Sequence, residues 1–179
     1  MPGFSQETSS LLTMASREAM VPQSERCRGP LLARAEVERL LPHRDPFLFL
    51  DRITFVDPQN AMIVCRYDLD HATSILAGHF PRTPLWPGVL QVEAIGQAGL
   101  CLANLLREAA VERSESGLGL TNILGARFIR PVTPSGGELE IVSRVLPDGL
   151  FNIIVGQCLQ GGSICSAAAL RGIDKERQE

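Results

Sequence analysis

The sequence predicts one α+β domain in which an antiparallel sheet of about six strands surrounds a single long helix. Three observations lead to this prediction. Residues 88–107 are apolar on nearly every face, which is typical of a helix that is buried on all sides. The second half of the chain contains four β-like segments joined by short glycine-containing turns. The length of 179 residues suits one domain.

The composition indicates a folded protein that neither binds nucleic acid nor spans a membrane. Apolar residues make up 45% of the chain and charged residues 21%, which is enough apolar material for a core. The formal net charge of −3 does not favour nucleic acid as a partner, because phosphate binding needs a basic surface. The longest apolar segment, residues 89–106, is interrupted by Gln91, Glu93, Gln97 and Asn104, so it predicts no membrane span.

Cysteine and histidine usage predicts reduced thiols and no metal site. The five cysteines are odd in number and form no Cys-x-x-Cys pair, which is typical of small buried residues in a cytoplasmic protein. The three histidines, His43, His71 and His79, show no ligand spacing with cysteine or acid. The first residues also lack the basic and then apolar layout of a secretory signal.

The chain divides into a polar N-terminal segment and one folded domain. Residues 1–30 show no sustained apolar period, so we expect a flexible tail, with a short helix as the alternative. Residues 31–179 form the domain. Within it we expect helical turns at 31–41, an extended segment at 47–56, and strands at 61–69, 122–130, 138–146, 150–160 and 163–171.

A proline-rich loop leads into the long helix. Pro81, Pro84 and Pro87 recur at every third position, which excludes a helix or a central strand and predicts a stiff, extended loop. Pro87 suits the first turn of a helix, where its missing N–H costs nothing. The loop therefore presents His79 just ahead of a helix that carries Glu93 in its second turn.

His79 and Glu93 are the candidate catalytic pair. Neutral imidazole is a natural base near pH 7, and burial of a carboxyl group among apolar side chains favours its proton-donating form. Gln97 lies one helical turn after Glu93 on the same face and can hydrogen-bond to it. From spacing alone, the alternatives are a loop histidine that satisfies backbone carbonyls and a polar line that faces solvent.

Gly88 adds a third element to this region. It opens the helix, so free backbone N–H groups point outward at the positive end of the helix dipole, and no side chain keeps a substrate away. Such groups can stabilise a carbonyl oxygen that becomes enolate-like. Base, acid and oxyanion donors together match the elimination of water from a 3-hydroxyacyl thioester.

Three motifs resemble the 3-hydroxyacyl-acyl-carrier-protein dehydratase family. Residues 78–99, GHFPRTPLWPGVLQVEAIGQAG, resemble the family pattern GHFPxxPxMPGVLxxEAxAQ. Residues 41–53, LPHRDPFLFLDRI, are similar to LPHRxPFLLVDRV, and residues 126–139, ARFIRPVTPSGGEL, are similar to RFRRPVxPGDxL. The resemblance covers residues 31–171 in the family's order. It implies the hot-dog fold, in which an antiparallel sheet wraps around a long central helix.

The resemblance implies roles for individual residues. By motif, His79 is the catalytic histidine, Glu93 is the catalytic acid, and Gly88 supplies the N–H that faces the thioester carbonyl. Gln97 matches the glutamine that supports the acid. His43 matches a position in the N-terminal motif, where we expect a structural role rather than a catalytic one.

The resemblance also implies an acyl pocket lined by Phe80, Trp86 and Val89. Trp86 stands where the family usually has Met, and Arg82 stands where Gly is frequent. Both departures lie beside the family's acyl tunnel. They leave open the preferred chain length and the pathway, which is fatty-acid biosynthesis or a specialised lipid or polyketide pathway.

Acyl carrier protein is the partner that the resemblance implies. The substrate then arrives on a phosphopantetheine arm, and no bound cofactor is expected. Arg82, Arg127 and Arg130 are candidates for a basic docking patch, with solvated surface arginines as the alternative. Residues 111–119 are a candidate lid. The family pattern implies a homodimer whose sites use residues of both subunits, and a trimer of dimers is the larger assembly expected.

Two other functions remain open on the sequence alone. A hot-dog thioesterase would direct an acid or its activated water at the thioester carbon, and a non-catalytic acyl-binding subunit would need neither group. The pairing of His79 with Glu93 favours dehydration over both.

Overall fold

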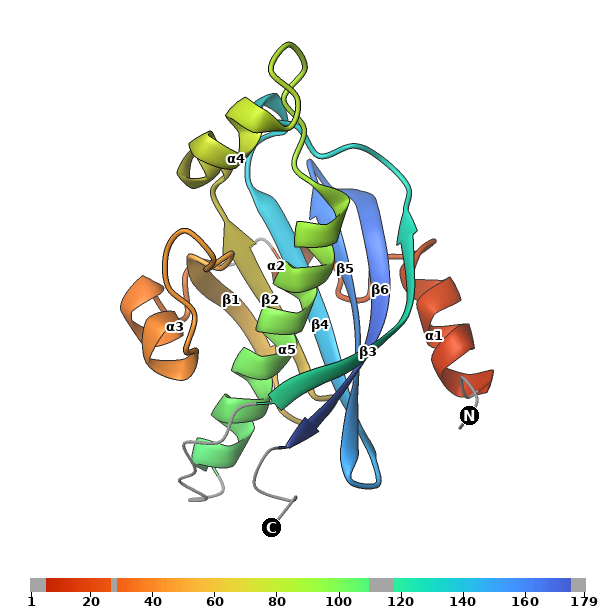
Figure 1. Ribbon diagram of the computed structural model, residues 1–179. Helices are drawn as coiled ribbons and strands as arrows, with labels where there is room; N and C mark the ends of the chain where they lie inside the picture. The colour runs from red at the N-terminus through yellow and green to blue at the C-terminus, as the bar shows by residue number, and fades with distance from the viewer. Residues whose placement is uncertain (1–5, 27–28, 110–117, 175–179) are drawn as a thin grey trace.

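A computed structural model describes residues 6–26, 29–109 and 118–174 of the chain (Figure 1). Most of the candidate lid therefore lies outside the described residues. The elements, in chain order, are α1 (Gln6–Ala15), α2 (Gln23–Arg26), α3 (Arg34–Leu40), β1 (Arg52–Asp57), β2 (Met62–Tyr67), η1 (Leu69–Ala72), α4 (Thr73–Gly78), α5 (Gly88–Ala109), β3 (Leu118–Phe128), η2 (Pro134–Gly136), β4 (Leu139–Asp148), β5 (Phe151–Gln160) and β6 (Ser163–Asp174).

The strands form one antiparallel sheet in the order β1-β2-β4-β5-β6-β3. Tight turns join β4 to β5 and β5 to β6, where Gly149, Gly161 and Gly162 have positive φ angles of 64°, 57° and 78°. Glycine adopts such angles without steric cost, which explains its presence at these turns. β3 precedes β4 in the chain but pairs with β6 at the far edge. This sheet and the long helix confirm the predicted α+β hot-dog fold.

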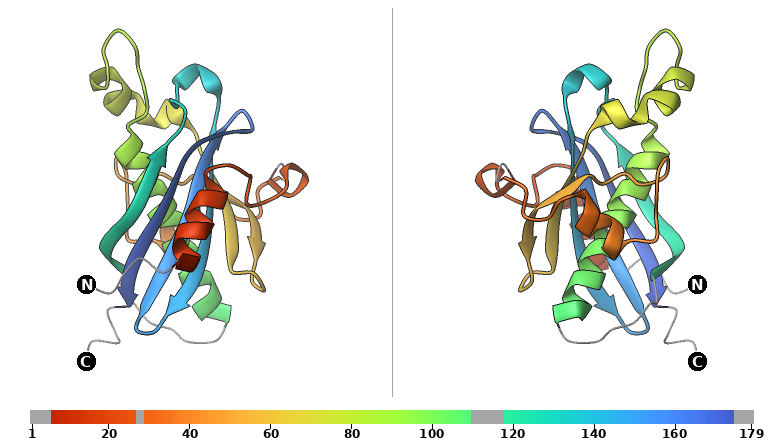
Figure 2. Two further views of the ribbon diagram at one scale, coloured as in Figure 1. Left: turned by 90° about the vertical axis from the view of Figure 1, so that its right-hand side faces the viewer. Right: turned by 90° about the vertical axis from the view of Figure 1, so that its left-hand side faces the viewer.

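Helix α5 packs across one face of the sheet, and α1 lies against the opposite face (Figure 2). Ile95, Ala98 and Leu102 are fully buried in the main core between α5 and the strands. Ser143 of β4 donates a buried hydrogen bond of 2.8 Å to the carbonyl of Ile95. Residues Gly88–Glu108 of α5 are long and apolar enough to cross a membrane, but more than half of their most apolar stretch is buried inside the protein.

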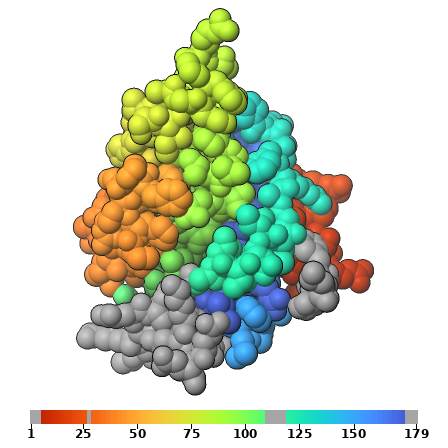
Figure 3. All heavy atoms as spheres, viewed as in Figure 1, coloured from red at the N-terminus to blue at the C-terminus, as the bar shows by residue number. Residues whose placement is uncertain are grey.

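One face of α5 is open, which differs from the prediction of a helix buried on all sides. Val89 is 71% exposed, and Glu93 and Gly96 are only partly buried. In the space-filling view, the first turns of α5 reach the surface between the segment around residue 40 and strand β3 (Figure 3). The apolar composition of α5 predicted burial on all sides, but composition does not identify the residues that would cover each face.

The N-terminal segment is not a free tail over the range that the structure describes. Helix α1 places Leu12 and Ala15 in a second apolar cluster with Ile153 and Val155 of β5. The outward-facing side of β5 and β6 is apolar, so it needs a cover, and α1 supplies it. For residues 6–15 the structure has the short helix that was the alternative to a tail. Its packing was not predicted, because the short apolar stripe of Leu11, Leu12 and Ala15 meets strands more than 130 residues away.

Two buried polar contacts fix this segment to the sheet. The amide of Gln157 on β5 accepts from the backbone N–H of Met20 at 2.7 Å and donates to the carbonyl of Ala15 at 2.6 Å. Arg26 is 3% exposed and forms an ion pair of 2.7 Å with Glu140 of β4. Residues 6–26 are therefore a part of the folded unit.

The close approach of α5 to the sheet depends on Gly156 of β5. A Cβ atom at this position would lie 2.5 Å from the carbonyl oxygen of Val142 and 2.6 Å from Cγ2 of Ile95. We expect Gly156→Ala to lower the free energy of unfolding by about 1–3 kcal/mol, because the added methyl group overpacks the core. Urea unfolding followed by circular dichroism measures this change.

Gly29→Ala is the matched control, since a Cβ atom at Gly29 would meet no atom within 4 Å. The Gly29→Ala substitution should change the free energy of unfolding by no more than about 1 kcal/mol. Equal stability of Gly156→Ala and the unmodified protein would contradict this account of the helix–sheet contact.

Candidate functional site

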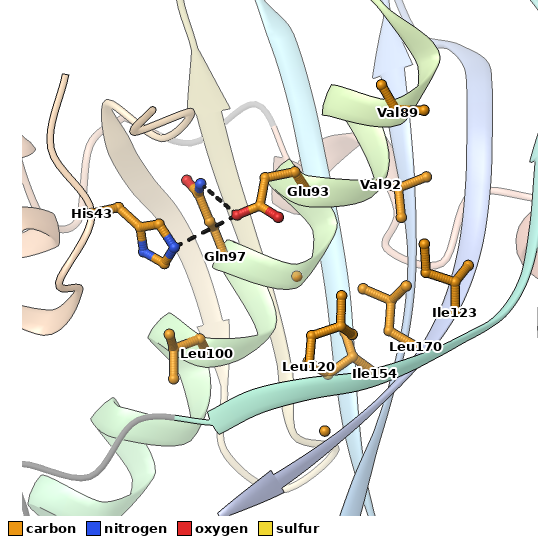
Figure 4. Close-up of a pocket in the computed structure, with 12 residues that line it drawn as sticks. His43, Val89, Val92, Glu93, Gln97, Leu100, Leu120, Ile123, Ile154 and Leu170 are labelled. Carbon is orange, nitrogen blue, oxygen red and sulfur yellow. Dashed lines mark hydrogen bonds and ion pairs between the residues drawn. The ribbon is translucent and has the colours of Figure 1, made fainter. Parts of the chain in front are cut away.

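A cavity of about 250 Å³ lies beside the open face of α5 (Figure 4). Its polar end is formed by His43, Glu93 and Gln97. Its apolar wall comes from α5, β3, β5 and β6 and includes Val92, Leu100, Leu120, Ile123, Ile154 and Leu170. A carboxyl group thus lies at the boundary between a polar cluster and an apolar chamber. Such a shape suits a ligand with a reactive polar group and a hydrocarbon tail.

Gln97 fixes the polar end of the cavity. Its side chain is 1% exposed, and its Oε1 accepts from the backbone N–H of Phe49 at 2.9 Å. Its Nε2 donates to the carbonyl of Phe47 at 2.9 Å and to Oε1 of Glu93 at 3.0 Å. The N–H of Phe49 can only donate, which determines the orientation of the amide. One amide N–H of Gln97 therefore faces Glu93, and the other faces the carbonyl of Phe47.

The Glu93 side chain is partly exposed, and a residue of the same helix orients its carboxyl group. Its side chain is 28% exposed, and Oε1 accepts from Gln97, one turn further along α5. The other carboxyl oxygen, Oε2, points away from Gln97 and from His43 (Figure 4). The predicted Glu93–Gln97 contact is therefore present in the structure, and one oxygen of the carboxyl group remains available to a ligand.

His79 lies at the C-terminal end of α4 and does not line this cavity in the described part of the chain. Its Nδ1 lies 3.0 Å from the carbonyl oxygen of Leu85. A carbonyl only accepts, so Nδ1 carries the hydrogen, and Nε2 of the neutral ring has the free lone pair that a base needs. Nε2 of His79 can therefore accept a proton, but the structure does not place His79 at the cavity that Glu93 lines in the same chain.

The loop from His79 to Leu85 is a tight turn, where the prediction was an extended segment. The backbone N–H of Thr83 donates to the carbonyl of Phe80 at 3.0 Å, and the N–H of Leu85 donates to the carbonyl of His79 at 2.7 Å. The rings of His79 and Phe80 stack with centroids 4.1 Å apart. These contacts hold the imidazole in place without regular secondary structure.

Gly88 begins α5 as predicted, and the structure adds a packing reason for glycine. A Cβ atom here would lie 2.7 Å from the ring of Phe128 on β3. The first backbone bonds of the helix run from Leu90 and Gln91 to the carbonyl of Pro87. The N–H groups of Gly88 and Val89 therefore precede the hydrogen-bonded ladder, where an oxyanion site is expected.

Of the three predicted pocket residues, the cavity includes only Val89 among those that the structure describes. Phe80 is 53% exposed at the surface. Trp86 is 2% exposed and packs in the core against Phe49 and Tyr67, with ring centroids 5.2 and 5.3 Å away. The bulk of Trp86 fills an aromatic cluster behind the loop, so it does not narrow this cavity.

The three predicted docking arginines have different surroundings. Arg127 donates to the hydroxyls of Ser16 at 2.9 Å and Thr13 at 3.1 Å, so it is engaged by α1. Arg130 donates to the carbonyl of Ile164 at 3.2 Å. Arg82 is exposed in the loop before α5. Sequence alone did not predict the contact with α1, because residues 1–30 were expected to be a tail.

His43 is the site residue that sequence reasoning missed. It lines the cavity, and its Nε2 lies 3.6 Å from Oε1 of Glu93. The motif around His43 was interpreted as structural because it matches the N-terminal part of the family pattern. No local sequence signal places His43 beside Glu93, because the contact depends on the bonds of Gln97 to Phe47 and Phe49, which bring that motif to α5.

The cysteines offer no nucleophile at this site in the described residues. Cys65, Cys101, Cys158 and Cys165 are free and buried. Burial raises the pKa of Cys101 and of Cys158 to about 12, so both thiols stay protonated near neutral pH. No group of three metal-ligating side chains is present in the same part of the chain.

The chain resembles known proteins over this region. A family model described as a FabA-like domain matches residues 41–148. A 3-hydroxyacyl-[acyl-carrier-protein] dehydratase FabZ from Campylobacter curvus is 33% identical over 141 residues, covering 77% of this chain and 94% of that protein. A protein of the same name from an Anaeromyxobacter species is 37% identical over 118 residues, covering 66% of this chain and 73% of that protein.

Solved structures support the fold. The dehydratase heterocomplex ApeI:P from Xenorhabdus doucetiae matches with a TM-score of 0.61 and 24% identity over 80% of this chain and 93% of that one. A mutant thioesterase, PA1618 from Pseudomonas aeruginosa, matches with a TM-score of 0.51 and 16% identity over 69% of this chain and 81% of that one. At these identities the matches report a shared fold.

Gln97 should matter for the site and for stability. Gln97→Met removes the partners of Phe47, Phe49 and Glu93 together. We expect a loss of about 1–3 kcal/mol in the free energy of unfolding, because the buried N–H of Phe49 and the part-buried carbonyl of Phe47 lose their bonds. Urea unfolding measures this loss, and the activity of the folded variant should also fall, since Glu93 is no longer oriented.

Asn104→Leu is the control for this prediction. Asn104 lies on the same polar line of α5 and donates to the carbonyl of Leu40 at 2.6 Å, away from the cavity. We expect lower stability with activity retained. Equal loss of activity in both variants would show that the polar line acts only through folding.

Proposed function

The chain belongs to the FabA-like family of 3-hydroxyacyl-acyl-carrier-protein dehydratases, and from this premise we propose that it removes water from (3R)-3-hydroxyacyl thioesters to give trans-2-enoyl thioesters. The observation that carries the proposal is the Glu93 carboxyl group at the mouth of an apolar cavity, fixed by Gln97. The activity serves fatty-acid biosynthesis or a related lipid or polyketide pathway.

The proposed reaction uses one base and one acid. Nε2 of His79 removes the proton from the α carbon, and the electron pair forms the double bond as the β C–O bond breaks. Glu93 gives its proton to the departing hydroxyl, which leaves as water. Charge that develops on the thioester carbonyl is stabilised by the N–H at Gly88. The proton on His79 is then transferred to Glu93, directly or through solvent, which restores both groups for the next cycle.

We propose that a second copy of the chain supplies His79 to each site. Glu93 lines the cavity and His79 of the same chain does not, so the site needs a histidine from outside. β3 lies at the edge of the sheet and, among the strands that the structure describes, pairs with β6 alone. Its Leu120, Ile123 and Phe128 are 55%, 60% and 58% exposed. An apolar edge of this kind is expected to be covered in the working protein.

A homodimer built on β3 explains these features together. Pairing of β3 with its copy satisfies the free edge and covers the exposed residues on the cavity side. Val89 and Phe80, which are 71% and 53% exposed, add apolar surface that we propose the same partner covers. A two-fold interface of this kind produces two identical sites. A trimer of such dimers is the larger assembly that we propose.

The substrate is proposed to arrive on acyl carrier protein in the cytoplasm. Arg82 and Arg130 remain as docking candidates near the loop that carries His79, while Arg127 is occupied by α1. The reacting groups are all side chains and backbone of the protein, so the proposal requires no cofactor beyond the carrier's phosphopantetheine arm.

A spectrophotometric assay tests this function. The purified protein, given 3-hydroxyacyl carrier protein, should produce the ultraviolet absorbance of an enoyl thioester. His79→Ala and Glu93→Gln should each lower kcat by about 10²–10⁴, the range for loss of a general acid or base. Thermal unfolding should remain close to that of the unmodified protein.

Other outcomes would contradict the proposal. Release of free thiol without enoyl absorbance would indicate a thioesterase. The absence of both signals across several chain lengths would indicate an acyl-binding subunit. Substitution of His71, which is exposed and bonded to Asp51, serves as the matched histidine control and should leave the rate unchanged.

A further inference from the structure

We propose that His43 is a positioning residue that, together with Gln97, directs the transferable proton of Glu93 to Oε2. The inference rests on the proposed function, because it deepens the role of Glu93 in that reaction. It gives a catalytic purpose to a residue of the N-terminal motif that lies 50 positions before Glu93 in the sequence.

The first support is the arrangement of donors around one oxygen. Nε2 of Gln97 lies 3.0 Å from Oε1 of Glu93, and Nε2 of His43 lies 3.6 Å from the same atom. The two side chains approach Oε1 from one side, and Oε2 points away from both (Figure 4). An oxygen that faces two N–H groups is a poor place for a proton, so the carboxylic hydrogen belongs on Oε2.

The second support is the state of the imidazole ring. Nδ1 of His43 is buried and has no hydrogen-bond partner in the described residues. A hydrogen on Nδ1 would be a buried donor without an acceptor, which is costly. The neutral ring therefore carries its hydrogen on Nε2, the nitrogen that faces Glu93. The 3.6 Å separation is longer than a hydrogen bond, and such contacts commonly shorten when substrate binds.

The third support is that the two elements are tied together. The loop that carries His43 is closed by Arg44, whose guanidinium donates to the carbonyls of His43 at 2.6 Å and Leu41 at 2.8 Å. The same loop is bonded to Gln97 through Phe47 and Phe49. His43 and Glu93 therefore keep their relative position through one buried amide.

The two oxygens of the Glu93 carboxyl group therefore have different roles. Oε2 faces the substrate and gives up the proton, while Oε1 remains bonded to the fixed donors. As the proton leaves, negative charge grows on the carboxyl group, and donors already in place at Oε1 stabilise it. The donors at Oε1 stabilise charge that develops in the transition state and not in the bound substrate complex. Loss of a donor should therefore lower kcat and leave KM nearly unchanged.

Steady-state kinetics of three variants test the proposal. His43→Leu removes the donor at Nε2, and we expect kcat to fall by about 10–100-fold, the worth of one hydrogen bond to a charged group, with KM within about 3-fold. His43→Gln places an amide N–H at the position of Nε2 and should restore kcat to within about 3-fold of the unmodified protein. His71→Leu is the control and should retain full activity.

A fourth variant, His43→Asn, covers a failure of His43→Leu to fold. His43→Asn keeps a polar side chain of similar size, but its amide ends at the position of Nδ1, so it should resemble the Leu variant in kcat. A thermal melt of each variant confirms that the compared proteins are folded. A higher kcat in His43→Gln than in His43→Asn then supports the proposal, and equal values contradict it.

Three results would overturn the proposal, and they differ from one another. A His43→Leu enzyme with unchanged kcat would show that Gln97 alone orients Glu93. Loss of activity in His43→Gln as complete as in Glu93→Gln would show that His43 itself transfers the proton. An inactive unmodified protein would reject the proposed function and this role with it.

Discussion

The hydrogen bonds of Gln97 are the interaction on which the site depends. One buried amide joins the backbone of Phe47 and Phe49 to the carboxyl group of Glu93, so the N-terminal motif and the central helix become one unit. Without this link, the loop and the helix would meet only through apolar contacts, which are not directional. The Gln97 amide therefore fixes the position of the Glu93 carboxyl group relative to the loop that contains Phe47 and Phe49.

The remainder of the fold supplies what this geometry requires. Gly156 lets α5 approach the sheet closely, and the bond from Ser143 to Ile95 fixes the helix at that depth. On the other face of the sheet α1 packs against β5 and β6, while the open side of α5 and the edge of β3 present exposed apolar side chains. The molecule thus presents Glu93 on one surface and His79 in a separate loop, which is the arrangement that a site shared between two subunits needs.

The sequence predicted the fold class, the long helix and the sheet, because periodicity and turn glycines are local signals. It also predicted the contact of Gln97 with Glu93, since a spacing of four residues on a helix determines which side chains meet. Long-range contacts were harder. The packing of α1, the burial of Trp86 and the position of His43 depend on which distant residues face them. For His43 and α1, the partners are 50 or more positions away in the chain.

Complementation between two inactive subunits tests the shared site most directly. His79→Ala and Glu93→Gln are purified separately, unfolded, mixed in equal amounts and refolded together. In a two-fold dimer each mixed pair has one complete site, so activity should return to about a quarter of that of the unmodified protein. If each chain contains its own complete site, the mixture should remain as inactive as its components, and that result would contradict the account given above.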